Sequence, residues 1–477
     1  MKRFAHSFSL IFIVLFGCGS DDGTDGMKDD DGRPEDPIGC FDSYAVNYQE
    51  NTILVDTECD YNPVACSSCD FVVPSDDLVI DNDDLDLPAG SVICFSAGSR
   101  VAIKIMNFQG EEGNPYIFSN CDGQALFDQT TNQTAIRVEN SSFLRITGTG
   151  SDDKYGIKVT AGSAAGLHGY GKVTDIEVDH LDITGTELGI WIVTRPECDG
   201  SANKGTFTQR NTIIHNNYIH DVGTEGMYIG GSKWDTGFSD SNTGCGTLEQ
   251  ADLVGVRIFR NRVIGTGWDG IQVGGAIEDS EIFSNEVADF GLKNNANHRV
   301  GIMINPGTTG KVFSNLVNKG KGFGIALLGF DLLVHSNLLV DCEEGGIHFG
   351  DRSPLPNKSY RILNNTLVDI PSKAFNMNSK VSTSNIIANN FIVNTDNEGT
   401  FNNSDILKTH NVMVESLDGF DFKDPANLDY TPLEGNALID SSYMDFDDNL
   451  IVDILLRERE SGGRLDIGAF EAQQQDE

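Results

Sequence analysis

A short pattern built on asparagine returns along residues 214–392. In each copy, an asparagine lies three residues after one aliphatic residue and two residues before another. Repetition of this kind indicates a solenoid, in which every turn of the chain contributes the same strands to the same faces. The copies are Ile214-Asn217-Ile219, Ile258-Asn261-Val263, Ile282-Asn285-Val287, Val312-Asn315-Val317, Val334-Asn337-Leu339, Ile362-Asn365-Leu367 and Ile387-Asn390-Ile392.

A second motif accompanies the first and consists of a small residue followed by apolar-x-apolar. The interval from the asparagine to the small residue is nine residues in five of six copies, and sixteen from Asn285 to Gly301. Because the two motifs repeat at a nearly constant distance from each other, we predict strands that stack in register from turn to turn. The motif begins at Gly226, Gly270, Gly301, Gly324, Gly346 and Ala374.

The composition of each repeat favours strands over helices. The apolar runs are three to six residues long, rich in Ile and Val, and broken by Gly and Asn without a helical period. Stacked parallel strands would bury each inward aliphatic side chain against its equivalent one turn away. We expect the repeated asparagine at a tight corner, because Asn tolerates the left-handed conformation and its amide can bond the neighbouring turn.

These repeats resemble the right-handed parallel β-helix family of secreted bacterial polysaccharide-active proteins, which have a pectate-lyase-like fold. The resemblance covers residues 75–471 and implies an all-β solenoid that acts on a polysaccharide. The stretches 87–95 and 114–123 resemble the opening turns of the family. The ending at 428–430, 437–440 and 466–471 resembles one shared by many bacterial β-helix proteins, and we expect it to cap the open stack.

The N-terminus has the features of a sorting signal. Lys2 and Arg3 precede an apolar run at 8–16 that is too short to span a bilayer. The stretch Leu15–Cys18 resembles a bacterial lipobox, so 1–18 is expected to be a lipoprotein signal peptide with Cys18 lipidated. The alternative is a plain signal peptide with an incidental cysteine.

Residues 19–37 are expected to be a disordered tether. They contain eight acidic and two basic residues and almost nothing apolar, so they cannot bury enough surface to offset their ordering entropy. Acidic residues after the lipidated cysteine resemble the signal that sends some Gram-negative lipoproteins to the cell exterior; a solvated spacer is the alternative. We therefore expect a surface-exposed outer membrane lipoprotein, held to the membrane through Cys18 and otherwise monomeric.

Residues 39–72 form a small cysteine-rich unit. Its Ala-x-Asn-Tyr sequence between two cysteines resembles a cysteine-paired module of bacterial surface proteins, which implies a Cys40–Cys59 disulfide. Cys66 and Cys69 are expected to close a second small loop. A zinc site is the alternative, but the spacing is irregular and export favours disulfides.

The remaining cysteines lie within the repeats. Cys94 and Cys121 are predicted to pair within the first turns. Cys198 and Cys245 fall in long inserts after equivalent strands, which suggests a disulfide between the inserts. Cys342 lies in an aliphatic run and is expected to be a free, buried thiol.

The charge limits the possible partners. The net charge of −39, from 72 acidic and 33 basic residues, argues against nucleic acid, which requires a basic footprint. Many acids among Asn and Gly loops are compatible with calcium, but no calcium-loop motif is present, so no cofactor is certain.

The middle residue of each apolar-x-apolar segment should point outward, because side chains alternate along a strand. Long inserts at 195–211, 231–252, 291–298 and 351–359 flank these strands, and loops on a rigid scaffold commonly carry function. The predicted outward stripe is Lys158, Trp191, Tyr228, Gln272, Met303, Ala326, His348 and Asn376.

Aromatic and basic residues on this acidic chain suit sugars that carry carboxylate or sulfate groups, because aromatic faces stack on rings and guanidinium forks bind anions. Each also has a simpler explanation: an outward tryptophan can pack beneath its own loop, and His348 can be an ordinary surface residue. The predicted substrate-binding residues are Trp191, Lys233, Trp234, Trp268, Gln272 and His298, and the predicted catalytic residues are Tyr228, His348, Arg299, Arg352 and Asp269.

A polysaccharide lyase is the favoured activity. β-Elimination on a uronic acid needs a neutralised carboxylate, a base and an acid, which these residue types can supply. The alternatives are a glycoside hydrolase, which needs two carboxylates such as those of Asp269, Asp331 and Asp351, and a non-catalytic glycan binder or adhesin. The motifs of the polygalacturonases and of the alginate epimerases are missing from the sequence.

Overall fold

The computed structural model describes residues 40, 42–49, 59–129, 133–160, 164–239, 244–352, 358–444, 450, 452–457, 459 and 464–472. The predicted signal peptide, the predicted tether and Cys18 lie outside these residues. The described chain is almost entirely β, with helix only in η1 (Cys66–Ser68), α1 (Asn82–Leu85) and η2 (Pro425–Asn427). None of the described helices has the length and apolar character needed to cross a membrane.

One wall of the solenoid is a parallel sheet of twelve strands, one from each turn. The strands of this twelve-stranded sheet are β2 (Val79–Asp81), β4 (Ile103–Met106), β6 (Ile136–Glu139), β9 (Ala165–Tyr170), β12 (Leu188–Val193), β16 (Met227–Gly230), β22 (Ile271–Gly274), β26 (Ile302–Ile304), β29 (Phe323–Leu327), β32 (Gly345–Phe349), β35 (Lys373–Met377) and β38 (Asn397–Phe401).

The solenoid has two further walls, which we call the first and second faces. The long strands β3 (Val92–Val101) and β5 (Tyr116–Gln129) run through both faces and so join them into one sheet, which begins with β1 (Phe71–Val73). The first face holds β7 (Ser142–Thr147), β10 (Thr174–Asp179), β14 (Thr212–His215), β20 (Arg257–Phe259), β24 (Glu281–Phe283), β27 (Gly310–Phe313), β30 (Leu332–His335), β33 (Tyr360–Leu363), β36 (Asn385–Ala388) and β39 (Ile406–Thr409). The second face holds β8 (Ile157–Val159), β11 (Leu181–Thr184), β15 (Tyr218–Val222), β21 (Arg262–Thr266), β25 (Glu286–Ala288), β28 (Leu316–Gly320), β31 (Leu338–Cys342), β34 (Thr366–Val368), β37 (Phe391–Val393) and β40 (Val412–Val414).

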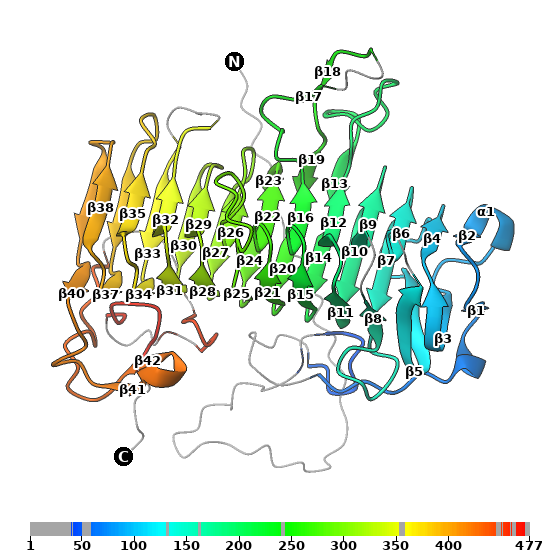
Figure 1. Cartoon of the computed structure of the whole chain (residues 1–477), viewed down its shortest axis with the longest axis horizontal. Helices are drawn as coiled ribbons and strands as arrows, with labels where there is room; N and C mark the ends of the chain where they lie inside the picture. Colours follow the sequence, from blue (N-terminus) through cyan, green and yellow to red (C-terminus); the bar gives the residue numbers. More distant parts are fainter. Residues whose placement is uncertain are drawn as a thin grey trace, which may run out of the picture.

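Inserts add small sheets outside the walls (Figure 1). They rise beyond the carboxyl ends of β12, β16 and β22, and a hairpin near the C-terminus lies beside the last turns. The insert strands are β13 (Thr208–Arg210), β17 (Phe238–Ser239), β18 (Thr247–Leu248), β19 (Asp252–Val254) and β23 (Ala276–Glu278), and the hairpin is β41 (Phe422–Asp424) with β42 (Asp429–Pro432).

The predicted asparagine ladder runs along the corner between the first and second faces. The Asn315 side-chain amide donates to Asn337 Oδ1 at 3.0 Å, and its backbone N–H donates to the same oxygen at 3.0 Å. Every asparagine from Asn217 to Asn390 repeats this bond, and the ladder continues one turn further to Asn411.

One detail of the corner prediction was wrong. The left-handed residue is the one before each ladder asparagine, such as Ser314 with φ 53° or Ser336 with φ 53°. The preceding residue turns the chain, and the ladder asparagine turns its side chain inward to satisfy buried carbonyls. The Asn315 amide thus also donates to the carbonyls of Ile282 and Phe313, both at 2.9 Å.

The aliphatic residues of the repeats line the interior in register. Ile258 lies opposite Ile282, which lies opposite Val312, and none of the three is more than 1% exposed. This continuous core confirms the predicted burial of the aliphatic residues. The stability of each turn therefore depends on the turns that stack against it.

The C-terminal segment was expected to cap the open end but packs along the outer sides of the later turns. Val452 and Leu456 cover a stack of Phe259, Phe283 and Phe313 on the outside of the first face, with ring centroids 4.9 and 4.8 Å apart. The last turn, formed by β38, β39 and β40, has no fully buried residue. The segment packs there because it buries these outward-facing aromatic rings, which are apolar like the open edge of the last turn.

The disulfides match two of the expected pairings and correct two. Cys40–Cys59 and Cys198–Cys245 are present as predicted, and Cys342 is a buried free thiol. The other two disulfides are Cys66–Cys121 and Cys69–Cys94. Cys94 lies opposite Ser119 in the register of β3 and β5, two residues from Cys121, so these two cysteines do not face one another.

Candidate functional site

The outward stripe of the twelve-stranded sheet exists as a line of residues in register. Tyr228 of β16 lies between Trp191 of β12 and Gln272 of β22. The line continues through Met303, Ala326, His348 and Asn376. Lys158 does not belong to it: the residue lies in β8 on the second face, and its ammonium is 2.7 Å from the Asp182 carboxylate.

In the opposite direction the line runs through residues that the sequence analysis missed. Lys104 lies opposite Arg137, which lies opposite His168, which lies opposite Trp191. We call the whole line from Lys104 to Asn376 the outer stripe. Its first members do carry the small-apolar-x-apolar motif, as Ala102-Ile-Lys-Ile, Ala135-Ile-Arg-Val and, with glycine at the last position, Gly166-Leu-His-Gly.

His168 and Trp191 stack directly on one another within the outer stripe. Their rings stack with centroids 4.1 Å apart and an interplanar angle of 2°. The exposed Arg195 lies over the indole, with its guanidinium carbon 5.2 Å from the ring centroid. The Trp191 Nε1 and His168 Nε2 atoms are buried without a hydrogen-bond partner. Both ring edges therefore have unused hydrogen-bonding capacity.

Burial and nearby charge keep His168 neutral. The side chain is 6% exposed, and its burial, followed by the charges of Arg137 and Arg195, lowers its pKa to about 4. A neutral imidazole at pH 7 can accept a proton, which is the property that a general base needs.

Arg137 and Tyr170 lie beside this imidazole. The Arg137 guanidinium carbon is 4.4 Å from the Tyr170 ring centroid, and the Tyr170 ring meets His168 edge-on at 5.6 Å. Arg137 Nε also lies 2.5 Å from a Glu139 carboxylate oxygen, which orients the guanidinium. A cation, a neutral base and a phenol thus meet on two adjacent strands.

At the carboxyl ends of the strands, Trp234 and Arg352 fasten the inserts. Trp234 Nε1 donates to Asp252 at 2.6 Å, and its ring lies against Gly275, where a Cβ would collide with it. Arg352 donates to the Ser232 carbonyl at 2.7 Å, 120 residues away in sequence. Lys233 is exposed beside them. The packing of Trp234 matches the simpler explanation, a tryptophan beneath its own loop.

At the amino ends of β16 and β22, Trp268, Asp269 and His298 form a separate group. The His298 ring stacks on Trp268 at 4.6 Å, and its Nδ1 lies 3.7 Å from Asp269 Oδ2. Arg299 turns away to Glu344, with Nε and a carboxylate oxygen 3.2 Å apart. The residues predicted to converge on one site are therefore divided between the two ends of the strands.

Tyr228 and His348 do not meet either. They are separated by four strand spacings, roughly 19 Å at about 4.8 Å per strand. The Tyr228 hydroxyl lies 2.7 Å from the Ser232 hydroxyl, while His348 stacks on Phe323 at 5.0 Å. The two side chains cannot act on the same sugar linkage.

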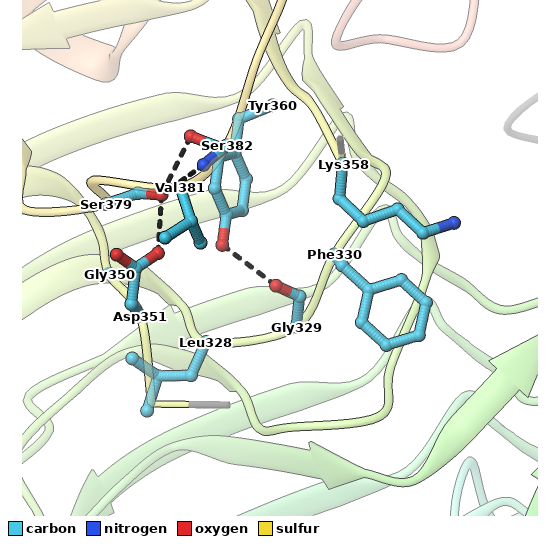
Figure 2. A pocket seen from close by; sticks show the side chains of 10 residues that line it. All are labelled: Leu328, Gly329, Phe330, Gly350, Asp351, Lys358, Tyr360, Ser379, Val381 and Ser382. Atoms are coloured by element: carbon cyan, nitrogen blue, oxygen red, sulfur yellow. Dashed lines mark hydrogen bonds between the residues drawn. The ribbon is translucent and has the colours of Figure 1, made fainter. Parts of the chain in front are cut away.

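A small hollow lies next to Asp351 (Figure 2). Asp351 accepts hydrogen bonds from the Ser379 hydroxyl at 2.6 Å and the Lys380 backbone at 2.5 Å. The Tyr360 hydroxyl donates to the Gly329 carbonyl at 2.9 Å. The polar groups that line the hollow already form hydrogen bonds within the protein, so few of them are available to bind a ligand.

A family model described as a right handed beta helix region matches residues 208–392. The chain folds as a right-handed parallel β-helix. No curated protein matches this β-helix protein in sequence.

Solved structures are similar to this chain at low sequence identity. The native GH136 lacto-N-biosidase from Eubacterium ramulus is similar with a TM-score of 0.51 and 14% identity, over 69% of this chain and 62% of that chain. This β-helix protein therefore spans about three fifths of the length of that enzyme. Pectate lyase Pel9A has a TM-score of 0.45 and 12% identity, over 85% and 97% of the two chains. A PL6 family alginate lyase, AlyGC, has a TM-score of 0.44 and 12% identity, over 76% and 55%.

Proposed function

We propose that the protein is carbohydrate-active, and that it binds an anionic polysaccharide along the first half of the outer stripe and cleaves it by β-elimination. The observation that carries this proposal is the unbroken line Lys104, Arg137, His168 and Trp191, with Arg195 over the indole. On a chain of net charge −39, a concentration of cations and aromatic rings on one wall points to an anionic ligand with flat apolar faces.

Binding uses two properties of the line. Successive side chains stand about 4.8 Å apart along the solenoid axis, so the line forms a straight track for an extended chain. Guanidinium groups bind carboxylate or sulfate with paired hydrogen bonds, and the Trp191 Nε1–H, which has no partner, is a donor for a sugar hydroxyl.

The residues around His168 can supply each requirement of β-elimination. Arg137 and Arg195 neutralise the uronate carboxylate, which acidifies the neighbouring C5–H bond. That bond breaks as its proton moves to His168 Nε2, its electrons form the C4=C5 double bond, and the C4–O bond breaks. The leaving oxygen takes the Tyr170 hydroxyl proton, and the proton held by the imidazole restores the phenol through solvent. Because His168 Nε2 is enclosed, the substrate must displace a neighbouring side chain to reach it.

Hydrolysis is the weaker alternative because the carboxylates proposed for it are occupied or buried. Asp351 accepts two hydrogen bonds, Asp331 pairs with Lys358 at 2.8 Å, and Asp269 is fully buried. A hydrolase needs two carboxylates beside the scissile bond, one of them able to donate a proton. The similar solved structures include both lyases and a lacto-N-biosidase, so the reaction must be decided by its products.

The test is a panel of polyuronates and sulfated uronans, with and without calcium, read by the ultraviolet absorbance of unsaturated products and by reducing ends in parallel. We expect both signals with a uronate polymer, and loss of turnover by at least about a hundredfold in His168→Asn. The matched control is His220→Asn on the second face. Reducing ends without ultraviolet absorbance would indicate a hydrolase, and binding without either product would indicate a non-catalytic binder.

We also propose that the protein is an outer membrane lipoprotein exposed at the cell surface, anchored through Cys18. A lipid anchor followed by the acidic segment 19–37 would hold the solenoid near extracellular polysaccharide. This proposal rests on the sequence resemblance of Leu15–Cys18 and is independent of the reaction.

A further inference from the structure

A second cluster of polar side chains lies outside the proposed polysaccharide site, at the amino ends of β16 and β22. Glu225 and Asp269 occupy equivalent positions on successive turns, each directly before the small residue that opens the strand. His298 reaches them from the 291–298 insert. Its Nδ1 lies 3.7 Å from Asp269 Oδ2 and 3.8 Å from Glu225 Oε1.

Both carboxylates are buried, and that of Asp269 lacks a hydrogen-bond partner for one of its oxygens. Asp269 is 0% exposed and Glu225 is 4% exposed. Asp269 Oδ1 accepts a hydrogen bond from the Val300 backbone at 2.7 Å, but Asp269 Oδ2 and His298 Nδ1 are buried atoms with no hydrogen-bond partner. The two unpartnered atoms face each other at a distance too long for a hydrogen bond.

No permanent cation balances this pair. Within the described parts of the chain, neither Glu225 nor Asp269 forms an ion pair with lysine or arginine. The nearby bases are engaged elsewhere: Lys293 lies 3.6 Å from Glu187, and Arg299 pairs with Glu344. Two buried carboxylates without a basic partner are costly, and a divalent cation is one of the ways in which proteins compensate such charges.

We propose that Glu225, Asp269 and His298 bind a first-row divalent transition metal ion, for which Zn²⁺ is the probe. The three ligand atoms lie within 4.8 Å of one another. Two ligand atoms bound at about 2.0–2.1 Å to a tetrahedral ion lie roughly 3.3 Å apart. The distances of 3.7 and 3.8 Å from His298 Nδ1 to the two carboxylates exceed this value by only a few tenths of an ångström. An imidazole among the ligands favours zinc over calcium, which takes oxygen ligands.

The surroundings suit a metal that stays accessible. The side chain of His298 is 36% exposed, so the cluster has an open side through which an ion and a water ligand can enter. Trp268 fixes the plane of the imidazole by stacking on it, and the Val300 N–H orients the Asp269 carboxylate. Such outer contacts orient the ligands of metal sites.

The experiment uses the full chain, stripped of metal with a chelator and titrated with zinc chloride by calorimetry. Metal content is measured after desalting. We expect one zinc ion per chain, and a fall in affinity of at least about a hundredfold in Asp269→Asn and in His298→Ala. Bound Co²⁺ should show the visible absorption of a low-coordinate site in the parent and lose it in both variants.

The matched control is Glu177→Gln. Glu177 belongs to another group of two carboxylates and a histidine, with the buried Asp179 and His215, but there Arg145 supplies the positive charge. Zinc affinity unchanged in this control supports the assignment. Glu225→Gln serves as a further variant if His298→Ala fails to fold.

Two results would overturn the proposal. If zinc binds equally well to Asp269→Asn and His298→Ala, the ion is held elsewhere on this acidic chain. If no stoichiometric zinc binds to the parent, a protonated His298 is the counter-ion of the two carboxylates. Neither result bears on cleavage of polysaccharide, because the inference does not rest on the proposed reaction.

Discussion

Arg145 and Asp42 lie 103 residues apart in sequence and form a buried, two-pronged ion pair, with nitrogen–oxygen distances of 2.9 and 2.6 Å. Arg145 also donates to Asp179 at 2.9 Å. Asp42 belongs to the cysteine-paired module and Arg145 to β7 of the first face. One guanidinium therefore joins the module to the solenoid.

Replacing Arg145 by methionine should destabilise the protein strongly. The substitution leaves Asp42 and Asp179 buried without their cation, and breaking such a pair from one side costs about 3–5 kcal/mol. Urea unfolding followed by tryptophan fluorescence measures the loss. Arg257→Met is the control, because Arg257 pairs with the more exposed Asp279. Equal losses in the two variants would show that the buried pair has no special role.

Replacing Asn315 by leucine should cost about 3 kcal/mol. The Asn315 side chain donates to two carbonyls and to Asn337, and its Oδ1 accepts from Asn285. Leucine leaves these buried groups unsatisfied, and each costs about 1–3 kcal/mol, partly recovered by relaxation. Asn297→Leu, at an exposed position in the 291–298 insert, should change the free energy of unfolding by less than about 0.5 kcal/mol. Similar losses in both would contradict a specific role for the ladder.

The stability of the protein should fall between pH 7 and pH 5, partly because of His335. Burial, followed by the charge of Arg459, lowers the pKa of His335 to about 3. The unfolded chain binds a proton near pH 6.5 while the folded chain does not, so stability is lost as pH falls below about 6.5. By pH 5 this amounts to about 2 kcal/mol.

His335→Phe should remove that part of the pH dependence. The His335 ring stacks on Phe313 with centroids 5.0 Å apart, so a phenyl ring can extend the existing stack. Denaturant unfolding at pH 7 and pH 5 should show about 2 kcal/mol less loss in the variant than in the parent. Parallel pH profiles would mean that His335 is not the titrating group.

The two tryptophans Trp191 and Trp234 should respond differently to substitution. Trp191→Ala removes the unpartnered Nε1–H donor and the ring that stacks on His168, so affinity for an anionic oligosaccharide should fall about tenfold, or about 1.4 kcal/mol, without loss of stability of the insert. Trp234→Ala should instead increase proteolysis of the 231–252 insert, because it removes the bond to Asp252. Glycan binding by calorimetry and limited proteolysis separate the two effects. Full-strength binding by Trp191→Ala would move the site away from the outer stripe.

Changing Cys18 to serine should release the protein from membranes. A lipobox cysteine is the acceptor of the lipid, and serine is not modified in its place. Detergent partition of cells that express the two forms measures the difference, with Cys342→Ser as a control for loss of a thiol. Unchanged partition would remove the lipoprotein assignment.

Local sequence determined the solenoid. Aliphatic residues at fixed distances from asparagine and glycine make each turn the same, and buried aliphatic columns and amide ladders are satisfied only by stacking those turns. The ladder from Asn217 to Asn390 and the line from Trp191 to Asn376 could therefore be predicted from spacing alone. The same motif at Arg137 and His168 cannot be predicted from the period, because the intervals between the small residues Ala135, Gly166 and Gly189 are unequal.

Only the tertiary structure decided which of the chemical groups meet. Loops and inserts have no period, so the sequence did not reveal that Arg352 reaches Ser232 or that Cys69 pairs with Cys94. It also did not reveal that Asp269 is buried opposite His298. A repeating strand constrains its side chains through its neighbours one turn away, whereas a loop is positioned by contacts far away in sequence. The fold could therefore be predicted from local sequence patterns, whereas the arrangement of the site residues could be seen only in the tertiary structure.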